Sequence, residues 1–116
     1  MQLDLLENRL LGEIPTTLKT CLGLVRLYLE GNSFEGQIPQ SLKTLRGLEE
    51  MDISQNYFSG QIPNFLSKLL SLKYLNIFYN DFGGEVPTEG IFSNAREISI
   101  FGNNKLCGGV QELHFT

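Results

Sequence analysis

Few side chains in this sequence have the type and spacing that catalysis requires. Histidine, the commonest general acid or base near neutral pH, occurs once, as His114 near the C-terminal end. Glu49 and Glu50 form a carboxylate pair of the kind that hydrolases use, but adjacent residues of a strand point to opposite faces of its sheet. We therefore expect no acid–base or nucleophilic chemistry and predict that the chain is not an enzyme.

Two glycine pairs raise the question of phosphate binding. Neither Gly83-Gly84 nor Gly108-Gly109 is followed by the Lys-Ser/Thr of a phosphate loop, and no GxGxxG motif occurs. The sequence also has no cluster of metal-ligating residues. An excess of 13 acidic over 9 basic residues gives a net charge of −4, which argues against nucleic-acid and anionic-membrane partners. We expect no cofactor.

An internal repeat with a period of 24 residues runs through most of the chain. The unit reads LxxLxLxxNxFxGxIPxxLxxL, for instance from Leu24 to Leu45. The glycines that recur at this spacing are Gly12, Gly36, Gly60, Gly84 and Gly108. The asparagines are Asn8, Asn32, Asn56, Asn80 and Asn104.

Each position of the unit has a physical role. The LxL leucines alternate with polar residues at a period of two, which indicates a short strand with one buried face. The asparagine both donates and accepts hydrogen bonds, so the repeated asparagines predict a ladder that satisfies buried backbone groups in the turns. The glycine allows a backbone angle that a side chain forbids, and Ile-Pro fixes an extended turn before a short helical segment.

Stacking of these units predicts the fold, because a single coil cannot bury its own apolar face. We expect an α/β leucine-rich repeat solenoid with a curved parallel sheet on the concave side and short 3-10 or helical turns on the convex side. Residues 1–92 hold four repeats, the first of them partial and without an N-terminal cap, and residues 93–116 hold a degenerate last repeat and a truncated C-terminal cap. Ile98 lies one residue farther from Asn104 than Leu75 lies from Asn80, which predicts a bulge or an irregular last strand.

Residues beside the LxL leucines project onto the concave sheet, where solenoids commonly hold extended partners. We predict that a protein or peptide binds this lane, which consists of Arg26, Tyr28, Glu30, Glu50, Asp52, Tyr74, Asn76, Phe78 and Tyr79. The alternative is that the lane is ordinary solvated sheet surface.

Charge and aromatic residues divide this lane. Glu30, Glu50 and Asp52 make its middle acidic, which would suit a cationic peptide. Tyr74, Phe78 and Tyr79 form an exposed aromatic cluster, and large aromatic side chains are favoured interface anchors. The lysines of the same repeats, Lys19, Lys43 and Lys68, fall on the outer side.

The GxIP element resembles the plant-specific class of leucine-rich repeats, found in receptor-like kinases, receptor-like proteins and polygalacturonase inhibitors. The segments VPTEGIFSNA, from Val86, and GNNKLCGG, from Gly102, are similar to the last repeat and C-terminal cap of receptor-like kinases of the rice Xa21 and flagellin-receptor type. The resemblance implies the membrane-proximal part of an ectodomain at the extracellular face of the plasma membrane, engaged in extracellular and immune perception. It also implies a transmembrane helix and a serine/threonine kinase domain in a full-length relative, and a co-receptor kinase as a partner of the last repeats.

The sequence departs from the family pattern at both ends. It starts inside a strand, without the cysteine-bearing cap of such ectodomains, and shows neither a signal peptide nor an apolar span of about 18 residues. In the family the cap cysteine, here Cys107, pairs with a second cysteine farther along. Cys21 takes the place that Leu45 has in the next repeat, so we expect a small buried hydrophobic residue there. Uncapped ends predict self-association.

Two other functions stay open. The chain could be a stand-alone secreted inhibitor of a cell-wall hydrolase, or a truncated copy that does not signal. The receptor-like segments around Ile91 and Cys107 count against the inhibitor.

Overall fold

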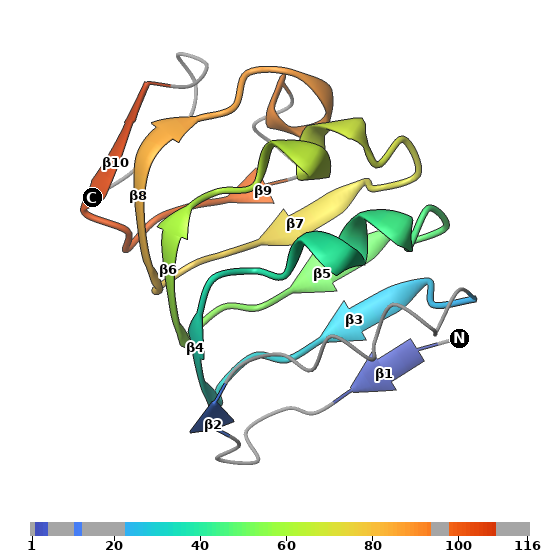
Figure 1. Cartoon of the computed structure of the whole chain (residues 1–116), viewed down its shortest axis with the longest axis horizontal. Helices are drawn as coiled ribbons and strands as arrows, with labels where there is room; N and C mark the ends of the chain where they lie inside the picture. Colours follow the sequence, from blue (N-terminus) through green and yellow to red (C-terminus); the bar gives the residue numbers. More distant parts are fainter. Residues whose placement is uncertain (1, 5–10, 13–22, 94–97, 109–116) are drawn as a thin grey trace.

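The chain winds into a solenoid in which successive coils add strands to two parallel sheets (Figure 1). The computed structural model describes residues 2–4, 11–12, 23–93 and 98–108. Several positions discussed above, Asn8, Lys19, Cys21 and His114, lie outside these ranges. The LxL motifs form a five-stranded sheet, here called the LxL sheet, in the order β1 (Gln2–Asp4), β3 (Arg26–Tyr28), β5 (Glu50–Asp52), β7 (Tyr74–Asn76) and β9 (Ile98–Ser99).

A second parallel sheet, which the repeat pattern does not predict, follows the turns after the LxL strands. It contains β2 (Leu11–Gly12), β4 (Ser33–Gly36), β6 (Tyr57–Gln61), β8 (Asp81–Val86) and β10 (Lys105–Gly108). In β4, β6 and β8 the phenylalanine of the NxFxG run is buried beside more exposed neighbours, and Leu106 has this place in β10. Gly36, Gly60 and Gly84 have φ angles of 83°, 82° and 81°, so the expectation of a backbone angle that requires glycine is confirmed.

Short 3-10 helices connect the second sheet to the LxL sheet of the next coil. They are η2 (Gln40–Thr44), η3 (Asn64–Lys68) and η4 (Gly90–Ser93). Pro39 and Pro63 precede η2 and η3 with φ angles of −64° and −63°, the values that the proline ring imposes. Parallel strands alternating with short helical turns confirm the predicted α/β solenoid. Within the described ranges, no helix has the length and apolar character needed to cross a bilayer.

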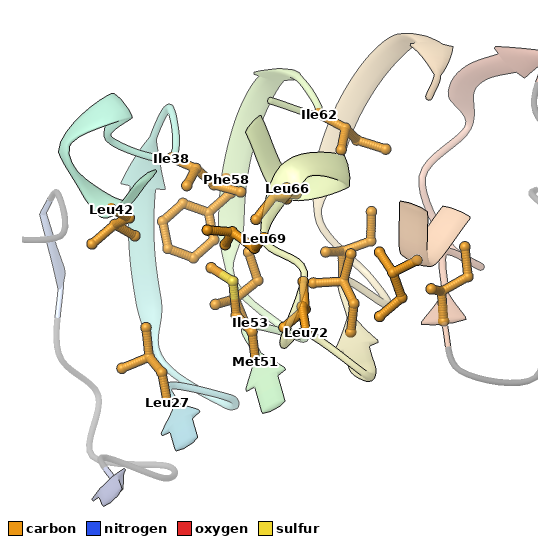
Figure 2. Close-up of a cluster of buried hydrophobic side chains, with 14 of the residues drawn as sticks. Leu27, Ile38, Leu42, Met51, Ile53, Phe58, Ile62, Leu66, Leu69 and Leu72 are labelled. Carbon is orange, nitrogen blue, oxygen red and sulfur yellow. The ribbon is translucent and has the colours of Figure 1, made fainter. Parts of the chain in front are cut away.

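The core lies between the two sheets and the 3-10 turns. Figure 2 shows side chains from all three, including Met51 of β5, Phe58 of β6 and Leu66 of η3, pointing into the same interior. The rings of Phe34, Phe58 and Phe82 stack from coil to coil, with centroid separations of 6.1 and 6.4 Å. Each coil therefore buries its apolar residues against its neighbours.

Asparagines of the repeat connect coils to the ones before them. The Asn56 Nδ2 donates to the carbonyl oxygens of Leu29 at 2.9 Å and Ile53 at 3.1 Å, and its Oδ1 accepts from the Phe34 N–H at 3.0 Å. Asn80 makes the equivalent bonds one coil later, accepting from the Phe58 N–H at 2.9 Å. Asn32 donates to the Leu29 carbonyl at 3.0 Å. These bonds satisfy backbone groups that the turns leave inside the core.

The last step of this ladder is Asn103, so the assignment of Asn104 is wrong. The Asn103 side chain is fully buried; it donates to the carbonyl oxygens of Ile77 and Ile100 and accepts from the Phe82 N–H at 3.0 Å. Asn104 is exposed. Counting one full repeat from Asn80 selects the wrong member of the Asn103-Asn104 pair. The reason is that the last LxL step is one residue shorter than the others, as the pairing of Leu75 with Ile98 shows.

The predicted irregularity consequently lies after the strand rather than in it. β9 pairs with β7 in the ordinary parallel register. The extra residue is accommodated between Asn103 and Leu106, where the Leu106 N–H donates to the Asn103 carbonyl at 3.2 Å. This turn restores the regular spacing of the second sheet, in which Leu106 pairs with Gly84 as Phe82 does with Gly60.

Candidate functional site

The strands of the LxL sheet bring the predicted lane into two rows. Arg26, Glu50 and Tyr74 are register partners in β3, β5 and β7. The second row lies two residues farther along the same strands, where Tyr28, Asp52 and Asn76 are register partners. Each of these strands is shifted from its neighbour by exactly one repeat, so like positions of the repeat are adjacent in space and residues far apart in sequence share one surface.

Glu50 is the centre of a polar network at the start of this surface. Its Oε2 lies 3.5 Å from the Arg26 Nε, and the Tyr28 hydroxyl donates to its Oε1. The hydrogen bond to the Glu50 carboxylate raises the pKa of Tyr28 to about 12, and the same bond lowers the pKa of Glu50. The charges of Arg26 and Glu50 therefore compensate each other within the LxL sheet.

Replacing Glu50 by glutamine should return the pKa of Tyr28 from about 12 towards its ordinary value of about 10. Tyrosinate absorbance after rapid pH jumps of the native protein measures this change. The titration step that is lost in the Tyr28→Phe variant is the one that belongs to Tyr28. Because the folded pKa is the higher one, the contribution of Tyr28 to stability is complete below about pH 10 and is lost as the pH rises through about 12. A step near pH 12 that keeps its full amplitude in Tyr28→Phe would contradict the assignment.

Asp52 does not lie free on the surface, contrary to the expectation from its position in the strand. Its side chain is buried, with Oδ1 accepting from the backbone N–H of Ser54 at 3.0 Å and from the Ser54 Oγ at 2.7 Å. Asn76 has the same role one coil later, accepting from the Phe78 N–H at 3.0 Å. These short polar side chains turn back to the main chain two residues on, which fixes the exit from the strand.

The predicted acidic middle of the lane consequently offers little unpaired charge. Asp52 is buried and bonded to Ser54, and Glu50 is shared by Arg26 and Tyr28. The third member, Glu30, is half-buried beyond the end of β3. The preference for a cationic peptide therefore has no support from Glu50 or Asp52.

An aromatic cluster lies at the C-terminal end of the LxL sheet and consists of Phe78, Tyr79 and Phe101. The Phe78 ring centroid is 4.2 Å from that of Tyr79 and 5.8 Å from that of Phe101. Tyr79 and Phe101 meet edge to face at 5.9 Å. The predicted cluster contained Tyr74 in place of Phe101, but the Tyr74 hydroxyl lies beside Asn76 in β7 instead. Phe101 stands two residues before Asn103, as Phe78 stands two residues before Asn80. The sequence alone therefore identifies Phe101 as the equivalent of Phe78 once Asn103 is taken as the ladder asparagine.

Backbone geometry holds this cluster in place. Tyr79 has a φ of 51°, and its N–H donates to the Phe101 carbonyl at 2.9 Å. A Cβ at Gly102, whose φ is 87°, would overlap the Tyr79 ring, so glycine is needed for the ring to lie against this turn. Tyr79 is 50% exposed and Phe101 43%. The cluster thus presents aromatic surface with little conformational freedom, as interface anchors do.

The expected cap cysteine lies in a strand of the second sheet. Cys107 belongs to β10, is exposed, and has a free thiol. Among the residues that the structure describes, no three His, Cys, Asp or Glu side chains gather as a metal site would require.

Comparisons with known proteins identify the architecture. The family described as leucine-rich repeat matches residues 22–82, more than half of the chain. No curated protein sequence matches significantly. The leucine-rich repeat ectodomain of the receptor kinase SOBIR1 from Arabidopsis thaliana is 35% identical with a TM-score of 0.82, and the match covers 94% of this chain and 59% of that one. The BIR2 ectodomain from the same plant is 37% identical with a TM-score of 0.79, covering 90% and 55%.

A third similar structure contains partners. The Arabidopsis receptor kinase HAESA, in complex with the peptide hormone IDA and the co-receptor SERK1, is 32% identical with a TM-score of 0.71 over 92% of this chain and 17% of that one. The present chain spans less than two thirds of SOBIR1, BIR2 and HAESA. These likenesses make the chain similar to the ectodomains of plant receptor kinases, and the chain belongs to the leucine-rich repeat family.

Proposed function

We propose that the chain is the membrane-proximal part of a receptor-like kinase ectodomain of the rice Xa21 and flagellin-receptor type, which serves immune perception at the outer face of the plasma membrane. The segments that end the repeats, from Val86 and from Gly102, support this assignment, because they resemble the last repeat and cap of those receptors. The likeness to HAESA, whose structure holds a peptide and a co-receptor, supports the same kind of partners here.

The aromatic cluster Phe78–Tyr79–Phe101 carries this proposal. It lies in the last two coils of the LxL sheet, and its rings are partly exposed and mutually packed. Aromatic side chains that are already ordered lose little freedom on binding and often dominate interface energetics. We assign this cluster to the contact with a co-receptor kinase ectodomain. The polar rows that begin at Arg26 and Tyr28 then face a peptide ligand.

Replacing Phe78 and Phe101 together by alanine should weaken co-receptor binding by about 30-fold or more, since anchor residues contribute about 2 kcal/mol or more. The measurement is surface plasmon resonance of a full ectodomain that carries these repeats against the SERK1 ectodomain. Tyr57→Ala is the matched control, because Tyr57 is 66% exposed but belongs to β6 of the second sheet. The double variant must keep the parent's circular dichroism spectrum; binding within about twofold of the parent would exclude the cluster from the contact.

A further inference from the structure

A hollow of about 530 Å³ lies between the η2 and η3 turns, away from the LxL sheet. We call it the turn-side groove. It is lined by residues of two successive coils: Lys43, Thr44 and Arg46 from one, and Phe65, Lys68, Leu69 and Leu70 from the next. Its volume falls within the range of about 300–1,000 Å³ that is usual for ligand sites.

The apolar side chains of the groove are not explained by the repeat. Leu70 is 94% exposed, and it stands where the preceding repeat has Arg46. Phe65 is only partly buried against the core and stands where the preceding repeat has Ser41. A single coil thus has two large apolar residues where the preceding coil has polar ones, and both line the groove. Contiguous exposed apolar surface of this kind marks interaction sites more often than isolated hydrophobic residues do.

The charged side chains of the groove are all cationic. Lys43, Arg46 and Lys68 line it, and no acidic side chain does. The ion pairs between described residues involve other cations, namely Arg26, Lys73 and Lys105. In a chain of net charge −4, three cations around an apolar lining form a local field that favours carboxylates.

Two hollows beside the second sheet are lined by residues of a different kind from those of the turn-side groove. One is lined by Gln37, Gln61 and other residues that include no large exposed apolar side chain. The other is lined by Lys68, which it shares with the turn-side groove, together with the acids Glu85 and Glu89. Neither of these two hollows combines an exposed apolar lining with charged side chains that are all cationic.

We propose that the turn-side groove docks an acidic peptide segment of a partner protein, with one large apolar side chain of that segment against Phe65 and Leu70. Carboxylates on either side of that apolar residue would pair with Lys43, Arg46 and Lys68. A recessed hollow of about 530 Å³ can receive a projecting side chain, whereas a membrane presents a plane of headgroups, so the recess favours a peptide. This site is separate from the LxL sheet and does not depend on the role proposed for the aromatic cluster.

Binding of fluorescein-labelled synthetic peptides to the full chain, followed by fluorescence anisotropy, tests this inference. The probe is a short peptide with one central tryptophan flanked by glutamates. Its matched controls replace the tryptophan by serine, or the glutamates by lysines. We expect the probe to bind at least about tenfold more tightly than either control, and to weaken as salt screens the charges.

Variants locate the binding. Lys43→Glu combined with Arg46→Glu, and separately Leu70→Ser, should each weaken probe binding by about tenfold or more. Lys105→Glu should leave it unchanged, because Lys105 is also exposed but lies in β10. Equal weakening by Lys105→Glu would show a mere effect of net charge and would overturn the proposal.

Other occupants give different results, each of which would overturn the proposal. Leu70-dependent binding to phosphatidylserine vesicles without peptide binding would assign the groove to a membrane. Self-association by light scattering that Leu70→Ser abolishes, again without peptide binding, would assign it to a second copy of this chain. Loss of co-receptor binding through Phe78 and Phe101 is measured in a different assay, so failure of one proposal leaves the other standing.

Discussion

Phe58→Ala is expected to lower the free energy of unfolding by about 3–5 kcal/mol, the usual range for removing a fully buried phenylalanine. Phe58 has no exposed surface and lies between Phe34 and Phe82, 6.1 and 6.4 Å from their ring centroids. Its removal opens a cavity in the middle of the stack and weakens the contacts of its coil with both neighbours. Urea denaturation followed by circular dichroism measures the loss.

Two further variants make the result specific. Tyr57→Ala changes the adjacent residue, which is 66% exposed, and should alter stability by no more than about 0.5 kcal/mol. Phe58→Leu keeps most of the apolar volume and should lose less than the alanine variant, which provides a measurement if Phe58→Ala does not fold. A similar effect of the Tyr57 and Phe58 alanine variants would mean that the stack does not couple the coils.

Asn103→Ala is expected to lower the free energy of unfolding by about 3 kcal/mol, whereas Asn104→Ala should change it by no more than about 0.5 kcal/mol. The Asn103 side chain makes three hydrogen bonds of 2.9–3.0 Å to the buried main chain, at Ile77, Ile100 and Phe82. Alanine would remove the side-chain partner of the Phe82 N–H and the Ile100 carbonyl, and would leave the Ile77 carbonyl with the longer bond from the Asn80 Nδ2 at 3.3 Å. Each buried group that loses its partner costs about 1 kcal/mol or more.

The pair also tests the register of the last coil. Both variants remove the same amide from adjacent positions, so chain length, composition and unfolded-state effects are matched. Thermal denaturation of both proteins is the measurement. A large loss for Asn104 with a small one for Asn103 would support an uninterrupted repeat count and would contradict the pairing of Leu75 with Ile98.

The two faces of the solenoid use charge in different ways. On the LxL sheet, Glu50 is held by Arg26 and Tyr28, and Asp52 is buried against Ser54. The surface that remains for partners at the end of that sheet is mainly aromatic. On the turn side, cations instead surround apolar residues and no acid lines the groove. Partners of different chemistry would therefore suit the two faces.

The sequence by itself determined the features that depend on neighbouring residues in the chain. Alternation of leucines with polar residues predicted the LxL strands, and proline and glycine predicted the turns, because the preferred backbone angles of these residues are local properties. Repetition of one unit was enough to predict stacking, since one coil leaves its apolar face uncovered.

Only the tertiary structure decided which groups meet between coils. The second sheet forms because the neighbouring coil supplies the backbone partners of each NxFxG segment, and Phe101 reaches Tyr79 across such a step. Asn103 rather than Asn104 completes the ladder because the Asn103 side chain is buried and donates to the carbonyl of Ile77 in the preceding coil, whereas Asn104 is exposed. The turn-side groove likewise needs Arg46 of one coil beside Phe65 of the next. Such contacts join residues about one repeat apart, and their geometry exists only after the coils have packed.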